Sequence, residues 1–341
     1  MMKIDLRSDT LTKPTPEMLE AMMNAQVGDD LFDEDPTVHA LEEKMAKMFG
    51  KEEAMFCPSG TMTNQIAIKL HTQMGDEVIC DERSHIYHYE TGGMAFNSAV
   101  QPALIAGDRG RITAAQVKEK LRPDAFYMPK TALVSLENTA NKGGGAIYDL
   151  AEIKKIQAVC QQHQLPLHLD GARLFNALVE TGETPAEYGA CFDTISICLS
   201  KGLGAPVGSV LLGSKAHMAK ALRIRKVFGG AMRQSGFLAA AGIYALDHHI
   251  DQLKEDHRSA KILAEALEGL SFVESVVPPS TNILIFDLKA TIDPSAFLAK
   301  LEDHGIAAVP FGGQSIRFVT YYDFTDQHLE EAIQRLKKLD I

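Results

Sequence analysis

Short apolar segments alternate with helical segments from residue 54 to residue 250, and this alternation restricts the possible folds more than any other feature. The apolar, β-branched segments predict strands at residues 54–57, 77–80, 100–106, 132–136, 167–170 and 194–199. Helices are expected between them, for example over 113–121 and 149–162, and an earlier helix over 37–49 is expected to end at Gly50. Alternating strands and helices of these lengths favour a mainly parallel sheet with helices on both faces, so we predict an α/β fold.

The chain is expected to divide into an extended arm at residues 1–14, a large domain at 15–250 and a small C-terminal α+β domain at 251–341. In the small domain, helical patterns alternate with strand patterns at 257–270, 282–288, 294–304, 315–320 and 326–338. No GxGxxG motif opens a helix, which removes the main support for a nicotinamide-binding Rossmann domain.

The strand at 194–199 ends in a bend of glycines and small residues that contains one lysine, Lys201. An amine in such a tight, largely apolar setting is poorly solvated, which lowers its pKa and frees it to attack a carbonyl. Lys201 therefore has the setting of a lysine that forms a Schiff base. The alternative is an ordinary surface lysine on a loop.

Two further segments have the pattern of ligand-binding sites. Asp170 stands at the carboxyl end of the strand at 167–170, the end where ligands gather in open parallel sheets. A carboxylate buried there needs a cationic partner, although it could also simply cap the next helix. Ser59, Gly60 and Thr61 open a helix, whose free amides and dipole favour an anion such as phosphate, or they form a plain N-cap.

Seven motifs follow one another along almost the whole chain: Asp5–Thr10, Gly28–Asp30, Pro58–Thr61, His85–Tyr87, Glu137–Thr139, His168–Arg173 and Ser200–Leu203. In this order they resemble the L-threonine aldolases of the aromatic amino acid β-eliminating lyase/threonine aldolase superfamily. The resemblance implies a fold-type I enzyme with pyridoxal 5'-phosphate held covalently by Lys201 and its ring nitrogen paired with Asp170.

The resemblance also implies the remaining site residues. The cofactor phosphate is assigned to the helix start and to basic residues of a neighbouring subunit: Ser59, Gly60, Thr61, Lys226 and Arg233. Without the resemblance, the basic segment that holds Lys226 reads equally well as a solvated helix face. His85 is expected to stack on the cofactor ring, and it is also the candidate base for the β-hydroxyl proton. The substrate carboxylate and β-hydroxyl are assigned to Ser8, Arg173, Arg317 and Tyr127.

The expected reaction is retro-aldol cleavage of L-threonine or L-allo-threonine to glycine and an aldehyde. The alternatives are a β-eliminating lyase, a phenylserine-type aldolase or a non-catalytic protein that binds the cofactor. The chain departs from the family pattern at Tyr127, where some members have histidine, and at Ala140, where histidine is also expected. An arginine inside a strand, as Arg317 is expected to be, could instead form a cross-strand surface pair.

The formal net charge of −11 argues against nucleic acid and anionic membrane surfaces as partners. Five cysteines without a CxxC pair are typical of reduced thiols in a cytoplasmic protein, and the charged N-terminus lacks an apolar signal segment. His85 and His88 lie three residues apart but have no convincing third ligand, so no metal is expected. The expected partner is a small amino-acid substrate, and the family resemblance implies a homotetramer with active sites at a dimer interface.

Overall fold

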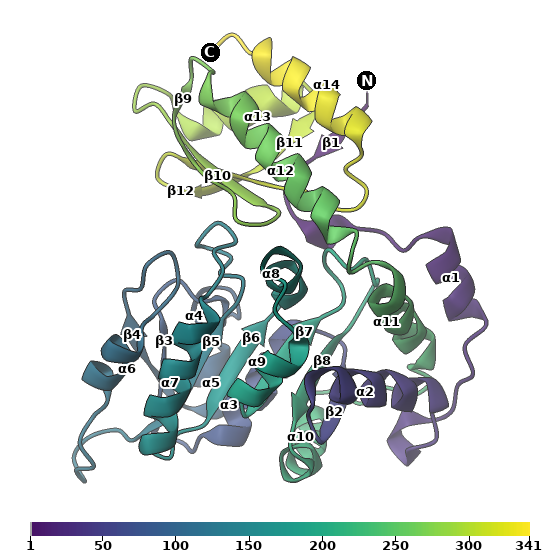
Figure 1. The fold of residues 1–341 in the computed structure, drawn as a ribbon, viewed down its shortest axis with the longest axis vertical. Helices are drawn as coiled ribbons and strands as arrows, with labels where there is room; N and C mark the ends of the chain where they lie inside the picture. Colours follow the sequence, from purple (N-terminus) through teal and green to yellow (C-terminus); the bar gives the residue numbers. More distant parts are fainter. Residues whose placement is uncertain (1) are drawn as a thin grey trace.

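The structure, a computed structural model, describes residues 2–341, and a seven-stranded sheet forms the centre of its larger part (Figure 1). The strands follow the order β2 (Glu53–Cys57), β8 (Ser209–Gly213), β7 (Thr194–Cys198), β6 (Leu167–Gly171), β5 (Thr131–Glu137), β3 (Glu77–Asp81) and β4 (Gln101–Ile105). Only β8 runs antiparallel to its neighbours, so the predicted mainly parallel sheet is confirmed. Strand β8 was not among the expected strands.

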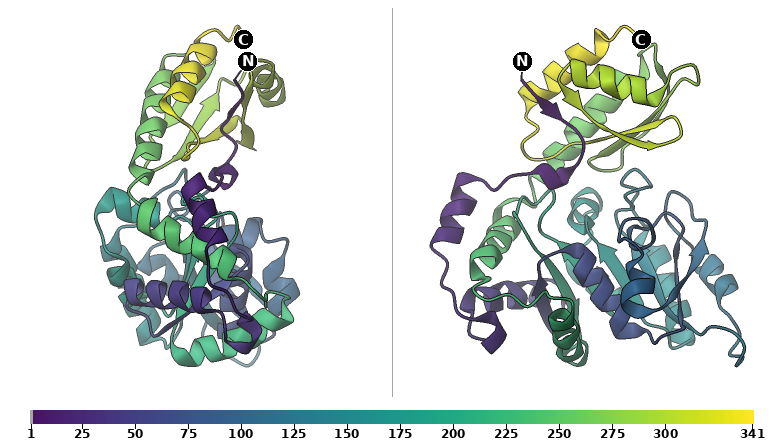
Figure 2. Two further views of the ribbon diagram at one scale, coloured as in Figure 1. Left: turned by 90° about the vertical axis from the view of Figure 1, so that its right-hand side faces the viewer. Right: turned by 180° about the vertical axis from the view of Figure 1, so that it is seen from behind.

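Helices cover both faces of this sheet, as the alternation predicts (Figures 1 and 2). One face packs on α2 (Pro36–Phe49), α6 (Ala114–Lys120), α7 (Leu150–Gln162) and α9 (Pro185–Cys191). The other face packs on α3 (Gly60–His71), α4 (His85–His88), α5 (Gly93–Ser98) and α10 (Lys215–Val227). The remaining helices of the larger part are α1 (Pro16–Met23), α8 (Leu174–Thr181) and α11 (Gly236–His248).

The smaller part is built on a four-stranded antiparallel sheet with its own hydrophobic cluster. Its strands are β12 (Val309–Gly312), β13 (Ser315–Val319), β10 (Ile283–Leu288) and β9 (Val273–Val277), and its helices are α12 (Leu253–Glu268), α13 (Pro294–Asp303) and α14 (Asp326–Lys337). Strands β9 and β12 were not expected. Helix α12 begins four residues before the predicted start, after Gln252, whose side chain makes no capping hydrogen bond that a sequence pattern could reveal.

The N-terminal arm joins the smaller part. Its strand β1 (Ile4–Asp5) pairs in parallel with β11 (Ile306–Ala307), and Ile4 and Leu6 are buried in the cluster of the smaller part. After β1, the arm runs past the junction between the larger and the smaller part (Figure 2). The predicted domain boundaries themselves stay a prediction.

The edge of the large sheet where β5, β6 and β7 end faces the smaller part (Figure 1). Because ligands bind outside the carboxyl ends of parallel strands, this edge is where a site is expected. Across residues 2–341, no helix is both long and apolar enough to cross a membrane.

Candidate active site

Asp170 lies at the carboxyl end of β6, the middle strand of the large sheet, and is almost fully buried. Its Oδ2 accepts a hydrogen bond from Asn64 Nδ2 at 2.9 Å, and its Oδ1 accepts one from the Ala172 amide at 3.2 Å. Helix α8 begins after Arg173, so Asp170 does not cap it. Within residues 2–341, no lysine or arginine pairs with this carboxylate, which leaves a buried anion in need of a cation.

Lys201 lies on the loop that follows β7, the strand next to Asp170. Its carbonyl accepts the Gly204 amide at 2.8 Å, and the residue is partly buried. The role of Lys201 stays a prediction. Lys201 and Arg173 line the same small cavity. The loop packs closely on α12, because a Cβ on Gly202 would lie 2.9 Å from a side-chain carbon of Leu253.

The start of helix α3 has the features of an anion cradle. The Ser59 hydroxyl accepts the Met62 amide at 3.2 Å and thus caps the helix, while the described residues supply no acceptor for the amides of Gly60 and Thr61. A Cβ on Gly60 would lie 2.4 Å from Cys198 Sγ, so only glycine fits here. Beside it, the hydroxyl of Ser209 is buried and has no hydrogen-bond partner within residues 2–341.

His85 opens helix α4 and belongs to a cluster of buried carboxylates. Its Nδ1 lies 3.0 Å from Glu90 Oε1, and its amide donates to Glu137 Oε2 at 2.7 Å. Burial alone would lower the pKa of His85, but the hydrogen bond to Glu90 and the neighbouring carboxylates outweigh burial and raise this pKa above its ordinary value. Burial, with the charge of Asp170, raises the pKa of Glu137 to about 7. Glu90 also accepts Asn64 Nδ2 at 2.9 Å.

A polar atom from each of His85, Glu90 and Asp170 lies within 4.8 Å of the other two, a spacing at which side chains can hold a metal ion. In this cluster, His85 Nδ1 and Asn64 Nδ2 already contact the carboxylate oxygens of Glu90 and Asp170. His88 points elsewhere, with its Nε2 2.7 Å from the Glu82 carbonyl oxygen.

Arg173, which belongs to the larger part, forms an ion pair with Asp9 on what we call the large-domain side of the site. Its Nε and Nη2 each donate to a different oxygen of Asp9 at 2.7 Å, and Asn282 Nδ2 donates to Asp9 Oδ2 at 3.2 Å. Burial alone would raise the pKa of Asp9, but Arg173 outweighs burial and lowers it to about 2. Ser8 adjoins this pair, with its hydroxyl accepting the Thr10 amide at 3.2 Å.

Arg317 extends from β13 on the opposite side of the site. Its Nη1 donates to Asn141 Oδ1 and its Nη2 to the Arg7 carbonyl, both at 2.9 Å, while its buried Nε has no partner within residues 2–341. Burial, together with the positive charge of Arg173, lowers the pKa of Arg317 to about 10. No carboxylate pairs with Arg317 among the described residues, although its guanidinium lies 5.2 Å from the ring of Phe311 on the neighbouring strand β12. The free Nε is thus available to an anion.

Three expected site residues do not lie at the carboxyl edge of the sheet within their own subunit. Lys226 is exposed near the end of α10, and Arg233 pairs with Asp29 at 2.9 Å. Tyr127 is 71% exposed on the loop before β5, beside Phe126 and toward the amino ends of the strands. Their expected roles stay a prediction.

Sequence reasoning missed Asn64, Glu90, Asn141 and the role of Asp9. Asp9 and Glu137 stood inside recognised motifs, but Glu90 had no signal beyond its place five residues after His85.

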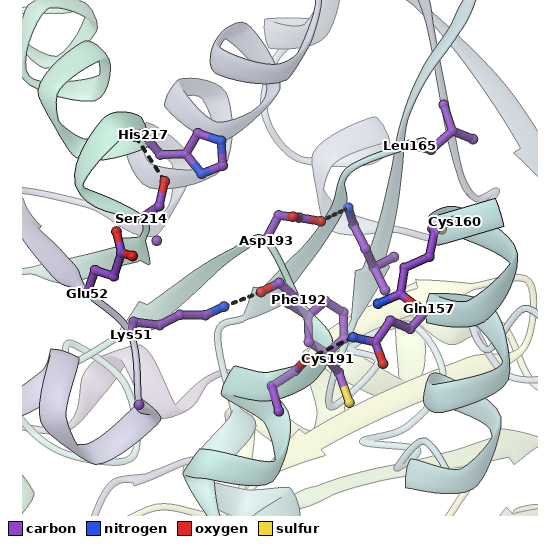
Figure 3. Close-up of a pocket in the computed structure, with 15 residues that line it drawn as sticks. Lys51, Glu52, Gln157, Cys160, Leu165, Cys191, Phe192, Asp193, Ser214 and His217 are labelled. Atoms are coloured by element: carbon purple, nitrogen blue, oxygen red, sulfur yellow. Dashed lines mark hydrogen bonds between the residues drawn. The ribbon is translucent and has the colours of Figure 1, made fainter. Parts of the chain in front are cut away.

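A separate cavity of about 400 Å³ lies at the opposite, amino edge of the sheet, where Lys51 points toward Phe192, and Asp193 and His217 also line it (Figure 3).

Comparison with known proteins gives consistent results. The profile of the beta-eliminating lyase family matches residues 5–291. Low-specificity L-threonine aldolase 1 of Arabidopsis thaliana is 40% identical over 333 residues, covering 95% of this chain and 93% of the plant protein. Low specificity L-threonine aldolase of Escherichia coli strain K12 is 42% identical over 333 residues, covering 96% of this chain and 97% of the bacterial protein. The solved structure of Leishmania major threonine aldolase superposes with a TM-score of 0.85 at 23% identity, covering 98% of this chain and 99% of that chain.

Proposed function

The chain belongs to the β-eliminating lyase family, and we propose that it cleaves L-threonine, L-allo-threonine and other L-β-hydroxy-α-amino acids to glycine and an aldehyde. Its fold is fold type I of the pyridoxal-phosphate enzymes. The observation that carries the proposal is the buried Asp170, which pairs with no lysine or arginine among residues 2–341 and lies on β6, beside the strand β7 that leads to Lys201.

The residues at this edge fit pyridoxal 5'-phosphate at three points. The Lys201 amine would hold the cofactor covalently, and Asp170 would pair with a protonated ring nitrogen. The free amides of Gly60 and Thr61, with the unpartnered Ser209 hydroxyl, fit a phosphate. When bound, the cofactor supplies an electron sink for the bonds at the substrate Cα.

The chain's own residues would then bind and orient the amino acid. Arg317 offers its unpaired Nε toward the substrate carboxylate, because planar guanidinium donors match a carboxylate. Ser8 adds a hydroxyl from the arm. Arg173 has two of its nitrogens held by Asp9 and so acts from a fixed position.

His85 is the proposed group that takes the proton of the β-hydroxyl. Glu90 accepts from Nδ1, which leaves Nε2 as the nitrogen that faces a substrate. Because its raised pKa favours the protonated form, His85 takes this proton only while it is neutral, and it can return the proton once it is protonated. The family resemblance supports a second, separate proposal, that His85 stacks on the cofactor ring.

We propose a homotetramer in which Lys226 and Arg233 reach the site of a neighbouring subunit. Support comes from apolar side chains exposed near the basic segment: Phe32 is 68% exposed and Val227 is 83% exposed. Five unpaired, buried cysteines are compatible with a cytoplasmic location, which we also propose.

The decisive experiment is to incubate purified protein with L-allo-threonine and measure glycine and acetaldehyde in parallel. We expect equal amounts of both products and a visible absorption band from bound cofactor. Lys201→Ala should lose both while the surface variant Lys155→Ala keeps both. A protein without a visible band would refute the cofactor assignment. A band without aldehyde, but with ammonia released from β-substituted amino acids, would favour the β-eliminating lyase.

A further inference from the structure

A line of buried polar side chains crosses the layer between helix α3 and the large sheet. It begins at Asp170 and continues through Asn64, His168 and Thr194 to His71. The four distances along it are 2.9 Å, 3.2 Å, 2.9 Å and 3.0 Å. Around it the same layer is apolar, as in the clusters that contain Ile66 and Ile68. Burying polar groups in such a layer costs free energy unless they are hydrogen-bonded, so each group in this line needs a hydrogen-bond partner.

Regular secondary structure places these residues in line. Asn64 and His71 lie seven residues apart on α3, which is two turns, so both face the sheet. His168 and Asp170 lie two residues apart on β6 and therefore point to the same face. Thr194 is the register partner of His168 on β7.

The direction of the first two hydrogen bonds follows from the carboxylates. Asn64 faces Asp170 and Glu90 with one end of its amide, and both are acceptors, so this end must be the NH2 group. The carbonyl end of Asn64 therefore faces His168 Nε2 and can only accept. His168 must carry its proton on Nε2. Burial lowers its pKa to about 4, so at neutral pH its Nδ1 is bare.

The remaining two bonds follow in turn. Nδ1 of His168 lies 2.9 Å from the Thr194 hydroxyl and 3.2 Å from the Thr194 carbonyl oxygen. A carbonyl oxygen cannot donate, so with the proton on Nε2 the closer Thr194 hydroxyl is the group that donates to Nδ1. That hydroxyl has then used its proton and must accept from His71 Nε2 at 3.0 Å. Burial lowers the pKa of His71 to about 3, so His71 is a neutral imidazole with its proton on Nε2.

We propose that His71, Thr194, His168 and Asn64 form a directed hydrogen-bond chain in which every donor points toward Asp170, and that they are positioning residues for its carboxylate. Aligned donors polarise one another, and hydrogen bonds to a carboxylate favour its ionised form. The hydrogen-bond chain thus orients the Asp170 carboxylate, which pairs with no lysine or arginine among residues 2–341. At the outer end of the line, the ring of His71 packs edge-on against the ring of His217, with 5.0 Å between the ring centroids. His217 also lines the cavity shown in Figure 3.

The directed hydrogen-bond chain fixes which ring nitrogen of His71 and His168 carries the proton, and this can be measured without any reaction. Solid-state 15N NMR of the full-length protein, labelled on histidine, distinguishes the two neutral tautomers, and His71→Gln and His168→Gln assign the signals. We expect both residues to be neutral with the proton on Nε2 from pH 6 to pH 8. A proton on Nδ1 of His168 would overturn the proposal.

The claim about Asp170 rests on the proposed function, because it concerns the group that Asp170 would pair with. Thr194→Val should weaken binding of pyridoxal 5'-phosphate about 5- to 10-fold, since it removes one hydrogen bond from the line. It should also shift the pH profile of the cofactor's visible absorption. Thr194→Ser should restore both properties because it keeps the hydroxyl.

The matched control is Thr131→Val on β5, which removes a buried threonine hydroxyl that donates to Glu77 at 2.8 Å, outside the line. Cofactor affinity and pH profile in Thr131→Val should equal those of the unmodified protein. Equal effects of Thr194→Val and Thr131→Val would reduce the line to general packing and refute the proposal. If the protein bound no cofactor, the proposed function would fail, while the tautomers would still test the direction of the chain.

Discussion

The two sides of the candidate site each carry an arginine, and the two arginines are held in opposite ways. On the large-domain side, Arg173 forms a buried two-point pair with Asp9. On the other side, the described residues give Arg317 only neutral partners, which are Asn141, a backbone carbonyl and the Phe311 ring, and its buried Nε has no hydrogen-bond partner within residues 2–341. From the sequence, both were equal candidates for a substrate carboxylate.

From this difference we propose that Arg173 has a structural role besides its fixed position at the site, whereas Arg317 is the arginine with a donor free for a substrate carboxylate. A buried cation that is fully paired contributes to folding, and removing it leaves its partner's charge exposed to a low dielectric. A buried cation with an unpaired donor carries a cost that a bound anion removes. Four experiments test this division.

The largest effect is expected on the large-domain side. Arg173→Gln should lower the free energy of unfolding by about 3–5 kcal/mol, because Asp9 would remain buried and charged without its partner. Urea unfolding of the full-length protein measures this. The double variant Arg173→Gln, Asp9→Asn should recover a large part of the loss. A loss below about 1 kcal/mol would mean that Arg173 has no such structural role.

Arg317→Gln should act on binding and leave stability nearly unchanged. We expect the KM for the amino acid to rise about 10- to 100-fold, the range for losing hydrogen bonds to a charged group. Arg317→Lys should fall in between, because an ammonium keeps the charge but loses the planar pair of donors. A fall in kcat at constant KM would contradict the assignment of Arg317 to the substrate carboxylate.

Acid should weaken the large-domain side selectively. Arg173 lowers the pKa of Asp9 from 3.8 to about 2, so the pair stabilises the fold fully above about pH 4. That contribution, about 2 kcal/mol, should disappear as the pH falls from about 4 to about 2. Urea midpoints between pH 5 and pH 2 should therefore fall more steeply for the unmodified protein than for Asp9→Asn. Parallel curves would show that Asp9 is not the group responsible.

The smallest effect is expected for the neutral partner of Arg317. Asn141→Ala removes one hydrogen bond to the guanidinium, so the KM should rise about 5-fold, less than in Arg317→Gln. The backbone amide of residue 141 still donates to Glu137 in this variant, which limits wider disruption. In the double variant with Arg317→Gln, the added effect should vanish. Additive effects would show that Asn141 acts independently of Arg317.

Much of the fold could be predicted because its signals are local. Helix α2 ends at Phe49, and Gly50 follows with a φ of 61°, a conformation that favours glycine. The strand before Asp170 was confirmed with the aspartate at its carboxyl end, since an apolar run with a terminal carboxylate needs only a few residues to be recognised. The early start of α12 escaped prediction because Gln252 makes no capping hydrogen bond. Strand β8 was missed although Gly208 and Gly213 mark its ends.

By itself, the sequence determined the layered α/β fold and placed Lys201, Asp170 and the start of α3 at one edge, because strand and helix periods repeat within a few residues. Only the tertiary structure decided which charges meet. Asp9 reaches Arg173 across 164 positions, and Arg317 reaches Asn141 across 176. Such contacts depend on how the arm, the sheet edge and the smaller part pack together. The role of each arginine follows from the partners that this packing supplies.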